Sequence, residues 1–185
     1  MKIEKVPKEE REVFRPLINK AAVYDAMASY YACDHEDGQV EVYGAFSGRR
    51  NPVGFLVRAR TGMDLFRPLL IPFVAREEVL TDLLDEVLVP SRPVLLMLPV
   101  EQWDWINSSV HLSAETRMDV YRLDPISYQP VMNVLVQSRE SPMGWPRYEI
   151  RSKSMTVAAA GVNWAGDRFV EVYVDLVENA RELAF

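Results

Sequence analysis

Two apolar, β-branched runs near the end of the printed sequence constrain the fold most, because two such strands need further structure to cover them. The runs are Met155–Trp164 and Arg168–Val174, and Gly166-Asp167 between them is typical of a short turn that joins two strands. An isolated hairpin is only marginally stable in water, since its apolar face and its edges stay open. The sequence therefore predicts a larger sheet that contains this hairpin.

A helix is predicted directly after the hairpin. Residues Glu178–Phe185 are mostly helix-forming and carry a carboxylate at the start, which suits the N-terminus of a helix. The sequence reaches Phe185 almost as this helix begins. We therefore expect the last unit of the chain to be part of a larger unit.

This segment resembles a known family. The run Ala158-Ala-Ala-Gly161-Val-Asn-Trp164, the second strand and Glu178–Phe185 are similar to the central hairpin and following helix of the GNAT N-acetyltransferases. The resemblance implies an α+β fold with a mixed, mostly antiparallel sheet flanked by helices. It also implies the transfer of an acetyl group from acetyl-CoA to a small-molecule or peptide amine.

The resemblance assigns roles to individual residues. Glu171 would be a general base and Tyr173 a general acid, while the backbone of Val172 and Val174 would pair with the pantetheine arm of the coenzyme and Arg181 would lie at its pyrophosphate. The family holds the pyrophosphate in a glycine-containing loop before a helix. The segment 179–184 keeps the arginine and lacks glycine. On periodicity alone, Glu171 is an ordinary outward-facing residue of an alternating strand and Tyr173 is a packed aromatic.

The earlier part of the chain shows the same order of elements, and this order again resembles a GNAT domain. Its pattern predicts strands, two helical regions and a helical turn. The strands are Lys2–Val6, Val40–Ser47, Val53–Arg60, Leu69–Ala75, Val94–Leu98 and Thr116–Leu123, the helical regions are Glu9–Cys33 and Arg76–Val89, and the turn is Glu101–Asn107. At the position of the pyrophosphate loop, Glu77 and Glu78 replace glycines, which disfavours phosphate.

The predicted domain boundary is the proline-containing segment Asp124–Pro130. It separates a GNAT-like domain at 1–123 from a partial second GNAT-like unit at 131–185. In tandem proteins of this family, the resemblance implies a degenerate N-terminal domain and a C-terminal domain that holds the coenzyme.

Composition excludes some classes of function. A net charge of −6 argues against a nucleic-acid-binding protein, which needs clustered Lys and Arg. No apolar run approaches the roughly 20 residues that span a membrane, and no signal-peptide pattern starts the sequence. The single cysteine, Cys33, cannot form an internal disulfide bond and suits a cytoplasmic location.

Other candidate sites have simpler explanations. Cys33 and His35 lack the second pair of ligands that a metal site needs, so we expect no metal. His111 lies in a serine-rich stretch that favours a loop histidine with local hydrogen bonds over a hydrolase dyad.

Three hypotheses stay open from the sequence. The chain is an acetyl-CoA-dependent N-acetyltransferase, or a non-catalytic GNAT-derived module for ligand binding or regulation. In the third hypothesis it is a truncated unit whose exposed strands are covered in a homodimer, with strands added across the two copies. The third is compatible with either of the others.

Overall fold

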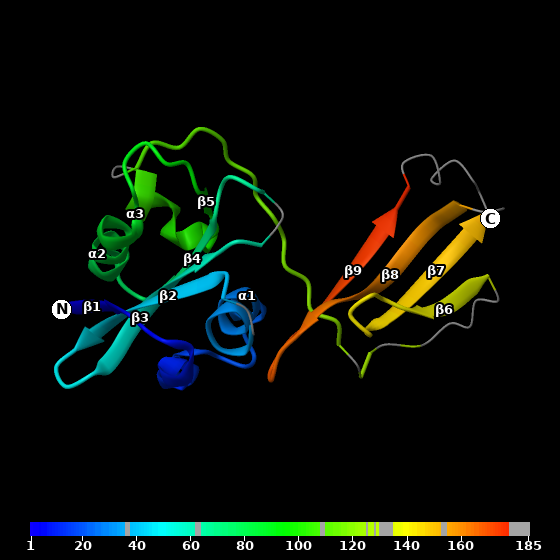
Figure 1. Ribbon diagram of the computed structural model, residues 1–185, viewed down its shortest axis with the longest axis horizontal. Coiled ribbons are helices and arrows are strands. Elements are labelled where there is room, and N and C mark those ends of the chain that lie inside the picture. Colours follow the sequence, from blue (N-terminus) through cyan, green and yellow to red (C-terminus); the bar gives the residue numbers. More distant parts are fainter. Residues whose placement is uncertain are drawn as a thin grey trace. The chain divides into compact units, whose positions relative to one another are not determined.

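The computed structural model describes residues 1–35, 38–61, 64–107, 110–124, 126–127, 129, 135–152 and 155–177, with the Asn107 side chain left out. The chain divides into two compact units, Met1–Tyr121 and Arg122–Phe185. Each unit contains one mostly antiparallel sheet (Figure 1), and all of the described helices belong to the first unit. The α+β class predicted from the sequence is confirmed at this level, while the assignment of GNAT-like domains stays a prediction.

The first unit is built on a five-stranded sheet. Its order is β1-β2-β3-β4-β5, in which neighbours from β1 to β4 are antiparallel and β5 runs parallel to β4. The strands are Lys2–Lys5, Val40–Ser47, Asn51–Ala59, Leu69–Val74 and Leu95–Leu96, in the order β1 to β5. The five strands predicted for this region up to Leu98 are thus confirmed, with small shifts at their ends.

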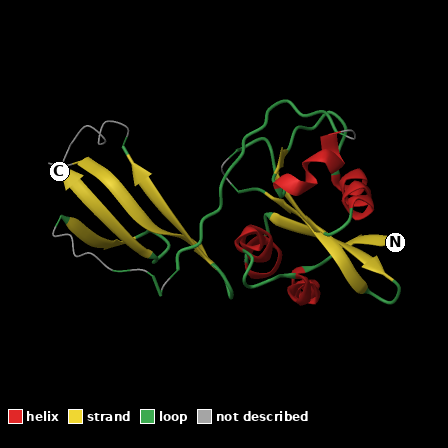
Figure 2. Ribbon diagram, turned by 180° about the vertical axis from the view of Figure 1, so that it is seen from behind, coloured by secondary structure: helices red, strands yellow, loops and turns green. Residues whose placement is uncertain are grey.

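Helical segments cover both faces of this sheet (Figure 2). On one side lie α2, Glu77–Val87, and α3, Trp103–Asn107, which follows the short turn η4, Val100–Gln102. On the other side lie the N-terminal helical segments η1, η2, α1 and η3, at Lys8–Leu17, Val23–Asp25, Ala26–Ser29 and Tyr30–Asp34. The predicted helical region 9–33 is therefore a series of short 3₁₀, α and π turns.

Helix α2 forms where the apolar spacing predicts it. Val79, Leu80, Leu83, Leu84 and Val87 are buried and share one face of the helix. They pack against Ala45, Leu56 and Leu70 of the sheet, and Ile106 of α3 joins the same core. Burial of this row of branched side chains is the main force that attaches α2 to the sheet.

An aromatic cluster fills the opposite face of the sheet. The ring of Phe14 from η1 lies 4.8 Å from the ring of Phe55 and 6.0 Å from that of Phe46, between centroids. Beneath these rings the strand carries Gly44, where a Cβ atom would lie 2.5 Å from Phe46 Cε2 and 2.7 Å from Phe14 Cζ. Glycine is thus required at this position because the two rings take the space of a side chain.

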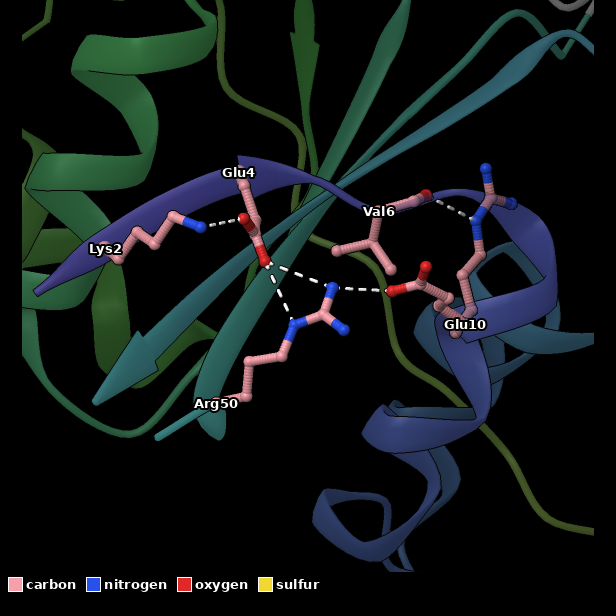
Figure 3. Close-up of polar contacts among 6 residues, drawn as sticks. Lys2, Glu4, Val6, Glu10 and Arg50 are labelled. Atoms are coloured by element: carbon pink, nitrogen blue, oxygen red, sulfur yellow. Dashed lines mark hydrogen bonds and ion pairs between the residues drawn. The ribbon is translucent and has the colours of Figure 1, made fainter. Parts of the chain in front are cut away.

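Polar contacts tie the N-terminal strand to the rest of the unit (Figure 3). Arg50, in the turn between β2 and β3, has a left-handed backbone with φ of 62°. Its guanidinium contacts Glu4 of β1 at 3.3 Å and Glu10 of η1 at 2.5 Å. Glu4 also pairs with Lys2, and the buried Arg11 donates to the carbonyl of Val6 at 3.3 Å. These bonds fix where η1 starts relative to β1.

The second unit is described as a four-stranded antiparallel meander in the order β6-β7-β8-β9. Its strands are Val136–Glu140, Pro146–Ser152, Met155–Ala165 and Val170–Leu176. The last two are the predicted hairpin, which is confirmed with its turn at Gly166-Asp167. The larger sheet that was predicted to contain this hairpin is present, because β7 pairs with β8 and β6 pairs with β7.

One predicted element is wrong and another lies outside the described residues. Residues 116–123, predicted as a strand, have no regular secondary structure and their side chains are exposed. An isolated apolar run becomes a strand only where a sheet edge accepts it, and this run pairs with none. The predicted helix at Glu178–Phe185, which contains Arg181, falls outside the described part of the chain.

Candidate functional site

The strand β9 separates polar from apolar side chains. Glu171 and Tyr173 are half-buried on one face, whereas Val172 and Val174 are 61% and 71% exposed on the other. The alternation follows from the two-residue period of a strand. The predicted catalytic pair therefore shares one face of the sheet, on which the side chains of β9 are polar and Trp164 of β8, paired with Glu171, is buried.

Tyr173 is held by an arginine from two strands away. The register aligns Tyr173 with Gly161 of β8 and Gly161 with Arg147 of β7. Arg147 Nη1 donates to the Tyr173 hydroxyl over 2.8 Å. A Cβ atom on residue 161 would lie 3.1 Å from the Tyr173 ring, so glycine allows the ring to cross β8.

Glu149 completes this network. Arg147 Nε donates to Glu149 Oε1 over 2.8 Å, and Thr156 Oγ1 donates to Glu149 Oε2 over 3.4 Å. The hydrogen bond from Arg147 lowers the pKa of the Glu149 carboxyl, and the same bond raises the pKa of Arg147. Arg147 and Glu149 were not predicted as site residues, and the only sequence signal was their alternation along Pro146–Ser152.

Glu171 lies apart from this network. Its carboxylate accepts a hydrogen bond from the side-chain amide of Asn163, over 2.5 Å. Asn163 sits at the irregularity in the pairing of β8 with β9, between Val162 and Trp164. The register places Glu171 opposite Trp164 and Tyr173 opposite Gly161. Among the described residues, no hydrogen bond joins Glu171 to Tyr173, so the two belong to separate sets of contacts.

A shallow cavity of about 240 Å³ opens beside this network. Arg147, Thr156 and Asp175 supply its polar lining, and Val157, Leu176 and Val177 are among its apolar walls. This volume lies just below the about 300–1,000 Å³ of typical small-molecule sites, so the space suits part of a ligand.

The residues predicted to pair with the pantetheine arm lie on the last strand of the sheet. The backbone N–H of Val177 donates to Val157 of β8, so alternate residues direct their backbone groups toward β8 and the others direct them outward. Val172 and Val174 belong to the outward set. Their backbone edge meets no strand among those described. Arg181, predicted at the pyrophosphate, lies outside the described residues.

In the first unit, the junction between β4 and α2 stands where the family resemblance places a phosphate loop. Glu77 and Glu78 occupy the first turn of α2 and are exposed. The carbonyl of Val74, the last residue of β4, accepts a hydrogen bond from Gln102 Nε2 over 2.8 Å. Two carboxylates thus lie at the helix N-terminus, and the side chain of Gln102 occupies the end of the strand.

Comparison with known proteins gives no relative. No family model, no curated protein and no solved structure matches the chain. Within the described residues, no group of three His, Cys, Asp or Glu side chains is arranged to hold a metal ion. No helix in this part of the chain is long and apolar enough to cross a membrane. The site is therefore interpreted from its own geometry.

Of the remaining candidates from the sequence, Cys33 and His35 contact neighbours within the first unit and His111 lies on its surface. Cys33 is buried, with Sγ 3.8 Å from the carbonyl of Arg11. The ring of His35 stacks on Tyr31 with centroids 5.3 Å apart. His111 is exposed, and the serines at 108 and 109 lie outside the described residues.

Asp25 is a buried polar residue that the sequence did not single out. Its Oδ2 accepts the backbone N–H of Asn19 over 2.8 Å. Its Oδ1 and the Oγ of the buried Ser29 have no hydrogen-bond partner among the described residues. Burial raises the pKa of the Asp25 carboxyl above its ordinary value, since charge is disfavoured away from water.

Asp25→Asn is expected to stabilise the first unit at neutral pH. A raised pKa in the folded state means that Asp25 binds its proton more tightly there, so its contribution to stability falls as pH rises from about 4. The amide removes this dependence and keeps an acceptor for Asn19. Urea unfolding at several pH values between 4 and 8 measures the effect. The exposed Asp82→Asn on α2 is the control, and an equal pH response in both variants contradicts the prediction.

Proposed function

We propose that this chain is a non-catalytic, GNAT-derived module that binds a partner through the strands of its second unit. A GNAT-derived origin is supported by the order of elements in the first unit. A strand and helical segments come first, and three antiparallel strands, a helix and a strand parallel to β4 follow. The buried, single Cys33 is compatible with a reducing compartment, and we place the protein in the cytoplasm on that ground.

The observation that carries the non-catalytic proposal is the junction of β4 with α2. A pyrophosphate needs backbone N–H groups at a helix N-terminus and a close approach, for which glycine is suited. This junction instead carries Glu77 and Glu78, whose charges repel phosphate. Gln102 also takes the carbonyl of Val74. Coenzyme binding in the way of the family is therefore disfavoured in the first unit.

The polar groups of β9 are already engaged in the second unit. Tyr173 accepts from Arg147, and Glu171 accepts from Asn163. A general base needs its carboxylate directed at the substrate, and a bond within the sheet opposes that. These contacts support a binding role for the sheet over proton transfer.

Acetyl transfer from acetyl-CoA to an amine is the second candidate. It is favoured by the outward backbone edge of Val172 and Val174, where an extended pantetheine arm has room to pair, and by Tyr173 on the same strand.

For the binding role, the partner that we propose is a second copy of the chain. An unpaired strand edge and uncovered apolar side chains both favour association, and β9 carries both. The result is a homodimer through the second-unit strands.

Titration calorimetry with acetyl-CoA and with CoA tests the non-catalytic proposal. We expect no binding up to millimolar coenzyme at modest salt, because the α2 N-terminus is acidic and the segment 179–184, where the resemblance places the pyrophosphate site of the second unit, lacks glycine. The double variant Glu77→Gln, Glu78→Gln lacks these two charges and is the control that measures how strongly they repel the phosphates of the coenzyme. Micromolar binding by the unmodified protein that is weakened by Arg181→Ala would overturn the proposal in favour of acetyl transfer.

A further inference from the structure

One face of the second-unit sheet carries apolar side chains from all four strands, although β6 also places Ser138 and Glu140 there. Residues that are paired directly across neighbouring strands lie on the same face. The register aligns Val136 with Ile150, Ala158 and Leu176 in one row, Tyr148 with Ala160 and Val174 in the next, and Val162 with Val172 in a third. These nine residues are called the apolar face below.

Much of the apolar face is uncovered. Tyr148 is 48% exposed although it lies on the interior strand β7, and Val172, Val174 and Leu176 are each more than half exposed. Large contiguous apolar patches are uncommon on monomers and mark interaction surfaces. A sheet with one such face is stable when another layer covers it.

We propose that two copies of the chain pack their apolar faces against each other, so that the two sheets form a sandwich across the dimer interface. This inference rests on the proposed self-association and specifies its surface. It places the contact on the face of the sheet, and the edge of β9 is not required to pair with another strand.

The size of the face suits this partner. Four strands about 4.8 Å apart, with seven residues at about 3.3 Å each, give a flat footprint of roughly 400 Å². The accessible area of the face is larger than this flat footprint, because side chains stand out from the sheet. It is therefore closer to the area that a standard interface buries, which is about 800 Å² per partner. Two sheets that pack face to face need only about 10 Å between them, so the side chains of both copies fill the space.

Charge also favours a second copy. A symmetric dimer brings the same patch of both subunits together, so any charge near the centre would meet its own kind. The nine residues of the apolar face carry no charge, and the charged Glu140 on the same side of the sheet lies at the end of the outer strand β6. The opposite face carries Arg147, Glu149, Glu171 and Asp175. The centre of the apolar face can therefore meet its own copy without repulsion between like charges, whereas the centre of the opposite face cannot.

The test uses lysine substitutions on the full chain, with light scattering across a range of protein concentrations. Tyr148→Lys and Val174→Lys each place a charge within the proposed contact, and both positions are exposed in the monomer, so the monomer is expected to fold with either lysine. Each is expected to raise the dimer dissociation constant at least about 100-fold, because an unpaired charge would be buried. Asp175→Lys adds a lysine to the same strand on the other face and is expected to dimerise like the unmodified protein. Far-UV circular dichroism checks that each variant is folded.

Tyr148 distinguishes the face from the edge. Its strand β7 is paired on both sides, by β6 and by β8, so strand addition at an outer edge does not involve it. A dimer that persists in Tyr148→Lys with unchanged affinity would overturn the sandwich and leave self-association through an edge. If Tyr148→Lys does not fold, Ile150→Lys, on the same interior strand and the same face, decides in the same way. A folded, unmodified chain that stays monomeric at every concentration would overturn both the inference and the proposed self-association.

Discussion

Phe14→Ala is expected to lower the free energy of unfolding of the first unit by about 3–5 kcal/mol, the usual cost of removing a buried phenylalanine. Phe14 is fully buried, and its ring contacts those of Phe46 and Phe55. The substitution leaves a cavity between η1 and the sheet, which the rigid strands cannot close. Equilibrium urea unfolding followed by circular dichroism measures the loss.

Phe66→Ala is the matched control, because the side chain of Phe66 is 90% exposed. It is expected to change stability by less than about 0.5 kcal/mol, as is usual for surface positions. Similar losses in the two variants would show that Phe14 does not anchor η1. Self-association is expected to persist in Phe14→Ala before the unfolding transition, since the proposed contact lies in the second unit.

Gly44→Ala is expected to destabilise the same unit by about 1–3 kcal/mol or more, the range for overpacking a close-packed core. A methyl group there would lie 2.5 Å from Phe46 Cε2 and 2.7 Å from Phe14 Cζ, so both buried rings must move. Urea unfolding again gives the difference. Gly38→Ala, with no atom within 4 Å of the added Cβ, serves as the control.

Coupling between the two positions sharpens this test. In a Gly44→Ala background, Phe14→Leu removes part of the ring that the new methyl group meets. The double variant is therefore expected to lose less stability than the sum of the two single variants. Additive losses would indicate that Gly44 is required for another reason than the Phe14 ring.

The elements with strong periodicity were predictable from the sequence. The five buried residues of α2 repeat at helical spacing, and the hairpin of β8 and β9 combines β-branched runs with a Gly-Asp turn. β6 was missed because Val136–Glu140 is mostly polar and wholly exposed, so only its pairing with β7 makes it a strand. The run 116–123 has apolar residues but finds no partner strand, which local pattern does not reveal.

The candidate site was only partly visible in the sequence. The resemblance pointed to Glu171 and Tyr173, and the structure places both on the polar face of β9. Arg147, which holds Tyr173, comes from β7, and only the register of three strands brings them together. Alternation predicted that β9 has two faces. It did not indicate that the valine face is the exposed one, because exposure depends on what covers the sheet.

Sedimentation equilibrium of the unmodified chain at several concentrations tests self-association through the second unit most directly. We expect the mass to rise with concentration from that of the 21.2 kDa chain toward twice this value, with the dimer present at micromolar protein. A single 21.2 kDa species across the whole range, in a folded sample, would contradict the account.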